Sequence, residues 1–234
     1  MFRGLLLLLT LGLVVAMAGW IVAQDGRPGG PGRPLDLPSG GIGDDEDEED
    51  APEVITFYSQ EYEGDAFFWC LDKSCSMGWS GGAPIATLKQ EMTSAINSLS
   101  SRAEFSMVAF NTSYQVWSPY PRRADPGAKA SAVGWVQQMT AAGTTCLAAA
   151  GVKTVQISNL SGKRHKTIII VGDGVPECPP PNSQQQNQDT LSQITGSNWQ
   201  MTPINTIFIS ASSQGVQFMQ TLAAMNGGTF LHVQ

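Results

Sequence analysis

The sequence predicts an α/β fold: a doubly wound, mostly parallel sheet of six strands with helices on both faces. From residue 53 onward, short apolar runs alternate with longer amphipathic segments, as strands and helices alternate in a doubly wound sheet. Two regions, 65–71 and 165–173, contain continuous runs of apolar residues. Strands that are buried on both faces of a parallel sheet have this pattern.

Turn and cap residues divide the chain into individual elements. Pro84 starts a segment with apolar residues at helical spacing, Asn111 lies in a turn between two strands, and Gly227-Gly228 follow the last helix. We predict helices at 84–99, 126–139, 145–158, 183–196 and 215–225, and strands at 65–71, 104–110, 114–117, 165–173, 204–210 and 229–234. Five strands are expected to be parallel, and the short edge strand within 113–117 antiparallel.

The N-terminus has the pattern of an export segment. Residues 4–23 contain no charged residue and follow Arg3. Ala16-Met17-Ala18 or Ile21-Val22-Ala23 would supply small residues for cleavage, but roughly 20 apolar residues can also span a bilayer uncleaved. Residues 1–23 are therefore predicted to be a signal peptide or an N-terminal signal anchor. Either alternative predicts an extracytoplasmic domain (secreted, periplasmic or at the cell surface), because Arg3 stays on the inner side.

Residues 24–52 are predicted to be a disordered linker, with the folded domain at 53–234. A Gly- and Pro-rich stretch precedes the acidic run DDEDEED at 44–50, and such a composition cannot bury enough apolar surface to fold. A calcium-binding EF-hand loop is the alternative for the acidic run, but that loop needs alternating ligands and a glycine at its sixth position. The run has neither feature, so we interpret it as a solvated spacer.

The net charge of −7 comes mainly from this N-terminal part. Residues 1–52 hold nine of the 20 acidic and three of the 13 basic residues, which leaves 11 acidic and ten basic residues for 53–234. A nearly neutral domain does not indicate nucleic acid or an anionic membrane surface as a partner. The one membrane contact that the sequence predicts is an uncleaved N-terminal anchor.

Oxygen-bearing side chains follow two predicted strands and precede one predicted helix. Open α/β sheets bind ligands at the carboxyl ends of their strands, so these side chains are candidates for one site. Two carboxylates in one crevice would repel each other without a cation, and oxygen-only ligands suit a hard cation such as Mg²⁺. The sequence thus predicts a metal site with candidate ligands from Asp72, Ser74 and Ser76, from Thr144 or Thr145, and from Asp173.

In this order the residues resemble the metal-ion-dependent adhesion site of von Willebrand factor type A (VWA) domains, over about residues 65–234. The resemblance implies the Rossmann-like VWA fold and a bound Mg²⁺ or Mn²⁺. It further implies that the hydroxyls of Ser74, Ser76 and Thr144 ligate the metal directly, and that Asp72 and Asp173 act largely through water. Thr144 is taken as the family's threonine, and Thr145 as a helix cap.

The resemblance implies a binding function and no enzymatic activity. In the family, an acidic side chain of a protein partner completes the metal shell, and movement of the last helix, here 215–225, can accompany binding. We therefore expect adhesion or complex assembly outside the cytoplasm. The alternatives are a non-adhesive scaffold or accessory subunit of an envelope complex, and a family member that has lost its metal.

A serine hydrolase is the alternative from another class. Residues 78–82 match the nucleophile-elbow pattern G-x-S-x-G, and Ser80, Asp173 and His232 follow the hydrolase order. The elbow serine must sit in the turn directly after a strand, however, and Ser80 lies eight positions beyond Asp72. We therefore predict no catalytic residue.

The four cysteines allow several interpretations. Cys70 lies within a predicted buried strand and is expected to be a small core residue. Cys75 replaces a glycine that is frequent in the family, and a disulfide from Cys75 to Cys146 or Cys178 is expected in an exported protein. Free thiols are the alternative, and a zinc site is disfavoured because there is no C-x-x-C pair. Trp79, which flanks the metal loop, is a candidate for surface recognition.

Overall fold

The computed structural model describes residues 51–178, 184–210 and 212–233. The predicted signal or anchor segment at 1–23 lies outside the described residues, as does the linker up to residue 50. Within the described ranges, no helix is both long and apolar enough to cross a membrane.

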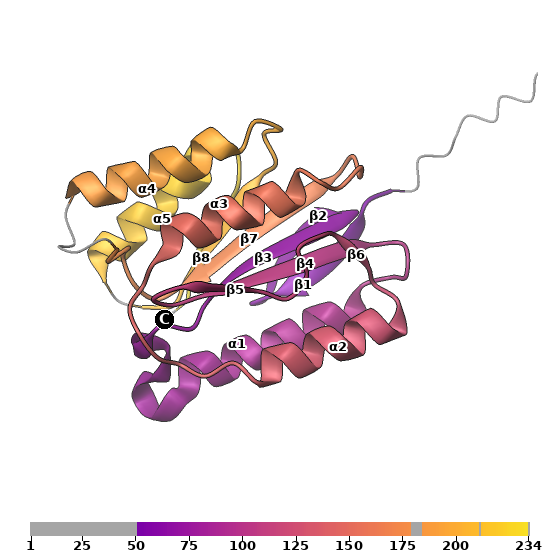
Figure 1. The fold of residues 1–234 in the computed structure, drawn as a ribbon, viewed down its shortest axis with the longest axis horizontal. Helices are drawn as coiled ribbons and strands as arrows, with labels where there is room; N and C mark the ends of the chain where they lie inside the picture. The colour runs from indigo at the N-terminus through magenta and orange to yellow at the C-terminus, as the bar shows by residue number, and fades with distance from the viewer. Residues whose placement is uncertain (1–50, 179–183, 211, 234) are drawn as a thin grey trace, which may run out of the picture. The chain divides into compact units, whose positions relative to one another are not determined.

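The main sheet has the predicted doubly wound topology, with strand order β5-β4-β3-β7-β8-β9 (Figure 1). All pairings between β4 and β9 along this order are parallel, and the edge strand β5 pairs antiparallel with β4. The six predicted strands are confirmed, and the two-residue strand β6 also pairs with β4. The strands are β3 (Ala66–Asp72), β4 (Glu104–Phe110), β5 (Tyr114–Val116), β6 (Arg122–Arg123), β7 (Lys166–Gly172), β8 (Ile204–Phe208) and β9 (Phe230–His232).

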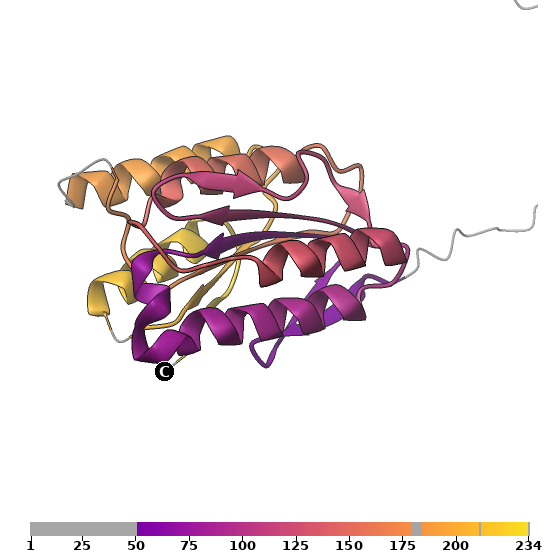
Figure 2. The same ribbon diagram turned by 60° about the horizontal axis from the view of Figure 1, so that its bottom comes forward.

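Helices cover both faces of the sheet, as Figures 1 and 2 show, with α1 and α2 on one face and α3, α4 and α5 on the other. Successive residues of β3 enter different cores: Phe67 and Trp69 pack towards α1 and α2, whereas Phe68 packs towards α3 and α5. Every residue of β3 is buried, as its continuous apolar pattern predicts. The helices are α1 (Trp79–Ser98), α2 (Pro126–Gln137), α3 (Leu147–Ser158), α4 (Gln184–Ser197) and α5 (Ser213–Met225).

A hairpin that the sequence pattern did not predict precedes the main sheet. Its strands β1 (Glu53–Phe57) and β2 (Gln60–Gly64) pair with each other and form a separate two-stranded sheet. Tyr58 and Ser59 make the turn with φ angles of 52° and 59°, a conformation usually signalled by Asn or Gly. The Glu91 side chain on α1 accepts a hydrogen bond from the Tyr58 N–H at 2.8 Å, which holds the turn against the domain.

The first helix begins with an irregular turn. Ser80, Gly81 and Gly82 have positive φ angles of 52°, 70° and 85°, so regular helix geometry starts only after Gly82. Pro84 then falls in the first regular turn, where its missing N–H removes no helical hydrogen bond. The predicted start at Pro84 therefore matches the regular part of α1.

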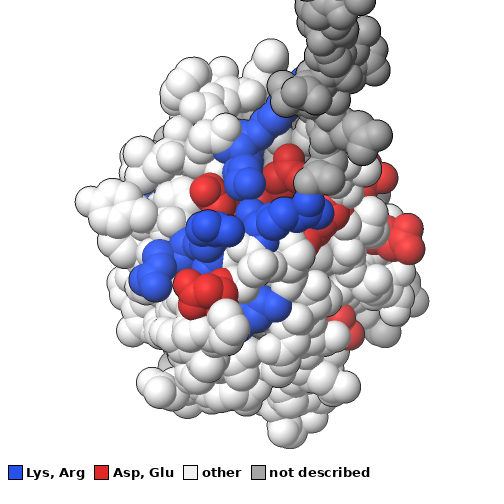
Figure 3. Space-filling view, turned by 90° about the vertical axis from the view of Figure 1, so that its right-hand side faces the viewer, with Lys and Arg blue, Asp and Glu red and all other residues white. Residues whose placement is uncertain are grey.

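Basic side chains lie at the amino-terminal ends of the strands, and the predicted metal ligands lie at the opposite, carboxyl ends. At the amino-terminal ends of the strands, Arg102, Lys163, Arg164 and His165 are among the residues that line a shallow hollow. Figure 3 shows Lys and Arg side chains gathered on this face, with acidic side chains between them. At the carboxyl ends lie the loops that carry the five predicted metal ligands.

Candidate metal site

Three loops meet at the carboxyl ends of β3 and β7. The two strands are parallel neighbours, so the loop that starts at Asp72 and the loop that starts at Asp173 leave the sheet side by side. The loop before α3 is joined to the first of these by two backbone hydrogen bonds. Cys75 donates to Gly143 O at 2.9 Å, and Ala142 donates to Lys73 O at 2.9 Å.

Four of the five predicted ligands form one chain of hydrogen bonds. The Ser74 N–H donates to Asp72 Oδ1 at 2.7 Å, and Ser76 Oγ donates to Asp173 Oδ1 at 2.7 Å. The two serine hydroxyl oxygens lie 3.1 Å apart. Because the single Ser76 hydroxyl proton is already directed at Asp173, the Ser74 hydroxyl is the donor between them. A short 3-10 helix, η1 (Cys75–Gly78), sets the position of Ser76.

The two carboxyl groups at this site are held in an unfavourable environment. Asp72 is fully buried, and burial raises its pKa to about 7, with the nearby Asp173 charge adding to the effect and the Ser74 hydrogen bonds opposing it. Burial also raises the pKa of Asp173, and the charge of Glu177 contributes in the same direction. A cation at this position would offset the free-energy cost of burying these two negative charges, because it favours the ionised form of both carboxyl groups.

The donor set fits a hard divalent cation. Asp72 Oδ2 is buried and has no hydrogen-bond partner among the described residues. A buried carboxylate oxygen without a partner is costly, and a metal ion or a metal-bound water would satisfy it. Within the same part of the chain, no three His, Cys, Asp or Glu side chains are grouped to hold a metal. A cation here would therefore depend on hydroxyl oxygens as well as carboxylates.

The adjacent threonines Thr144 and Thr145 occupy different environments. Thr144 is exposed, and its Oγ1 lies 3.2 Å from Thr112 Oγ1 and 3.5 Å from the sulfurs of both Cys146 and Cys178. Among the described residues, no hydrogen bond joins Thr144 to the chain of hydrogen bonds from Asp72 to Asp173. Thr145 is buried, and a Cβ atom placed on Gly174 would lie 3.2 Å from Thr145 Oγ1. Its hydroxyl thus lies against the residue that follows Asp173.

Comparison with known proteins identifies the family. Residues 71–231 match the von Willebrand factor type A domain. The chain belongs to this family. A comparison with curated proteins gives no match.

Solved VWA structures share the fold of this domain at low sequence identity. A von Willebrand factor type A protein from Catenulispora acidiphila has a TM-score of 0.62 at 18% identity, over 74% of this chain and 40% of that one. The pilus adhesin SpaC from Lactobacillus rhamnosus GG has a TM-score of 0.61 at 12% identity, over 78% of this chain and 29% of that one. This chain thus spans less than half the length of either.

A third structure is matched over most of its own length. The vWF domain of the type V pili tip protein Mfa5 from Porphyromonas gingivalis has a TM-score of 0.59 at 10% identity, over 77% of this chain and 90% of that chain. At these identities the likeness establishes the fold of the VWA domain.

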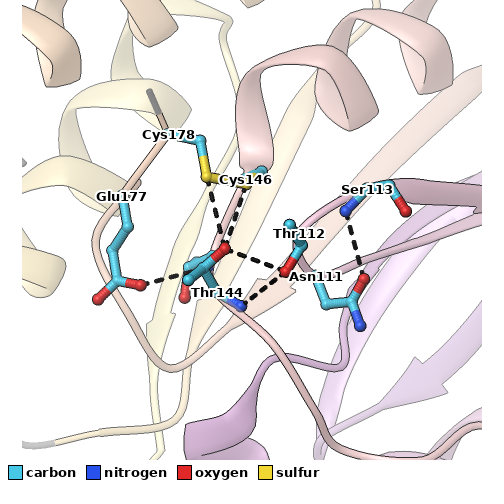
Figure 4. Close-up of a disulfide and its surroundings, with 8 residues drawn as sticks. Asn111, Thr112, Ser113, Thr144, Cys146, Glu177 and Cys178 are labelled. Carbon is cyan, nitrogen blue, oxygen red and sulfur yellow. Dashed lines mark hydrogen bonds between the residues drawn. A yellow bond between two sulfur atoms is a disulfide. The ribbon is translucent and has the colours of Figure 1, made fainter. Parts of the chain in front are cut away.

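The disulfide of the VWA domain differs from the predicted one. Cys146 and Cys178 are bonded, with Cα atoms 4.9 Å apart (Figure 4). Cys75 is an exposed free thiol. The prediction that Cys75 forms the bridge was therefore wrong. The Glu177 N–H donates to Thr145 O at 2.9 Å, so the backbone already brings the segments carrying Cys178 and Cys146 together. Cys70 is buried in the core as predicted, and burial raises the pKa of its thiol to about 12.

The alternative hydrolase residues are not assembled into a triad. Ser80 lies in the positive-φ turn at the start of α1, and Asp173 accepts its hydrogen bond from Ser76. His232 lies in β9, where its Nε2 is 2.6 Å from Ser210 O. Across the described residues, no hydrogen bond links Ser80 to Asp173 or to His232. This geometry gives Ser80 no base.

Proposed function

We propose that this VWA domain binds a protein partner outside the cytoplasm through a divalent cation, Mg²⁺ or Mn²⁺. The single observation that carries the proposal is the buried Asp72 carboxylate, whose Oδ2 has no partner among the described residues and lies beside a chain of hydroxyls ending at Asp173. This arrangement is costly without a cation and favourable with one.

The chain's own residues supply the neutral and the charged parts of this site. If Asp72 and Asp173 act through water, the hydroxyl ligands from Ser74 and Ser76 place no anion in direct contact with the divalent cation. The bound cation would then act as an electrophile with a position open to a carboxylate. An acidic side chain of the partner gains a strong charge-assisted bond there, which a Lys or Gln side chain does not offer. We therefore propose that the partner presents Asp or Glu.

The environments of the two threonines lead us to revise which of them serves the metal. The sequence analysis assigned the role to Thr144, but Thr144 is exposed and directed at Thr112 and the disulfide. The buried Thr145, against Gly174, is the better-placed hydroxyl. We propose Thr145 as the third hydroxyl ligand, with Thr144 as the alternative.

The names of similar structures support a role in adhesion or assembly. They include a pilus adhesin, a pilus tip protein and the PilB minor pilin from Streptococcus sanguinis. An accessory role in an envelope complex is the second candidate, and the similarity to an aerotolerance-related membrane protein from Bacteroides fragilis favours it. Both candidates place the domain outside the cytoplasm, as the N-terminal segment predicts.

Calorimetry and native-partner capture test the proposal together. Wild-type protein should bind Mg²⁺ at millimolar concentration or below, and should retain an envelope partner that chelator releases. Asp72→Asn should lose both properties, whereas Ser80→Ala, a change in the same region outside the site, should keep both. Metal binding without any effect of chelator on the partner would limit the metal to a structural role. Absence of binding heat in folded wild-type protein would refute the proposal.

A further inference from the structure

The Cys146–Cys178 disulfide connects the two loops that bring separate parts of the metal site together. Cys146 caps the amino terminus of α3, directly after Thr144 and Thr145. Cys178 lies five residues after Asp173, in a segment without regular secondary structure. The disulfide therefore links the loop that carries Thr145 covalently to the loop that starts at Asp173.

Few other contacts hold these loops together. Glu177 makes the main ones among the described residues: its N–H donates to Thr145 O at 2.9 Å, and its Oε2 accepts from the Thr145 N–H at 3.4 Å. Figure 4 shows these residues around the disulfide, with the Thr144 hydroxyl directed at the two sulfurs. Breaking the disulfide would leave residues 174–178 held to the loop before α3 mainly by these contacts of Glu177, whereas Asp173 keeps its hydrogen bond from Ser76.

The disulfide is also accessible. Both cysteines are partly exposed, and the neighbouring Thr144 and Glu177 are exposed. Cys70, in contrast, is a free thiol that is completely buried in β3, so it is not accessible for thiol–disulfide exchange. Exposed disulfides beside a functional site are the ones that thiol exchange can open.

We propose that Cys146–Cys178 is a redox-sensitive control of the metal site, opened by a dithiol reductant and closed again on reoxidation. This proposal rests on the proposed metal-dependent function. A thiolate of the reductant attacks one sulfur and displaces the other as a thiolate, and the second thiol of the reductant then closes its own disulfide. Cys146 and Cys178 gain two electrons and two protons, and the dithiol is oxidised to a disulfide.

Reduction should weaken the metal site without unfolding the domain. Reduction removes the covalent link between the segments that carry Thr145 and Asp173, while β3 and β7 keep their ladder of backbone hydrogen bonds. Loss of a contact that orients a ligand typically costs about 10- to 100-fold in metal affinity. We therefore expect the Mg²⁺ dissociation constant to rise by about 10-fold or more on reduction.

The test compares the oxidised full chain, the same protein reduced with dithiothreitol, and the Cys146→Ser/Cys178→Ser double variant. Mg²⁺ calorimetry should show weaker binding in the last two. Hydrogen exchange should be faster in peptides covering 173–178 and unchanged in β3. Cys75→Ser is the matched control: it removes an exposed thiol from the neighbouring loop after β3 and should respond to reduction as wild type does.

Each outcome decides one of the two proposals. Equal Mg²⁺ affinity and equal exchange in both redox states would overturn the redox control. So would loss of the circular dichroism signal on reduction, because the disulfide would then brace the whole domain. If neither redox state binds Mg²⁺, the metal proposal fails, and the exchange of residues 173–178 alone decides whether the disulfide controls the loop.

Discussion

Replacing Asp72 by Asn should stabilise the metal-free domain while abolishing its response to Mg²⁺. The pKa of Asp72 rises from 3.8 to about 7 on folding, mainly through burial. A raised carboxyl pKa means that the folded state binds more protons than the unfolded state between these values. Stability therefore falls as the pH rises from about 4 to 7, by at most about 4 kcal/mol at 1.36 kcal/mol per pKa unit. Asn removes this charge and retains an Oδ1 acceptor for the Ser74 N–H.

An unsatisfied amide group offsets part of this gain in stability. The amide Nδ2 takes the place of the buried Oδ2, which has no partner among the described residues, and an unsatisfied buried donor costs roughly 1–3 kcal/mol. We therefore expect Asp72→Asn to be about 1–3 kcal/mol more stable than wild type at pH 8 in chelator, and this difference to shrink towards pH 5. Saturating Mg²⁺, at a hundredfold excess over its dissociation constant, should stabilise wild type by roughly 2.7 kcal/mol and the variant by nothing.

Chemical denaturation of both proteins at pH 5 and pH 8, with chelator and with Mg²⁺, measures the free energy of unfolding of each protein under all four conditions. A variant that is less stable than wild type at pH 8 without metal would show that the buried Asp72 charge does not destabilise the folded state. Equal stabilisation of both proteins by Mg²⁺ would place the cation elsewhere. Either result would refute the reasoning from the geometry of Asp72.

Three further predictions concern other positions. Thr145→Ala should weaken Mg²⁺ binding in calorimetry about 10-fold or more, whereas Thr144→Ala should change it little; the reverse order would restore Thr144 as the ligand. Trp79, which is 69% exposed beside η1, should contribute to partner binding, so Trp79→Ala should raise the partner's dissociation constant and leave Mg²⁺ affinity unchanged. Gly228→Ala should lower the melting temperature strongly, because its Cβ would lie 2.0 Å from Ile204 O, while Gly134→Ala in α2, with open space around it, should be neutral or stabilising by up to about 1 kcal/mol.

The sequence determined the fold class and pointed to the residues of the candidate site, because both depend on local patterns. The continuous apolar runs of β3 and β7 are a property of strands buried on both faces, and they predict Asp72 and Asp173 at the ends of strands; the structure makes these strands neighbours. The spacing of Ser74 and Ser76 after Asp72 likewise put three oxygen-bearing side chains in one loop. The structure brings all four together through hydrogen bonds.

The tertiary structure decided which residues face one another across loops. The sequence pattern does not predict the hairpin β1–β2, because its turn uses Tyr58 and Ser59 at positive φ. The turn is supported by Glu91, which is 33 residues away from Tyr58 in the sequence. Cys75 lies within the predicted metal loop, yet the backbone contact between Glu177 and Thr145 pairs Cys146 with Cys178. Thr144 and Thr145 are adjacent in sequence, and only the packing of the loop against Gly174 directs one hydroxyl inward and leaves the other at the surface. Local periodicity reports which face of an element is buried, but it contains no information on contacts between loops that are far apart in the chain.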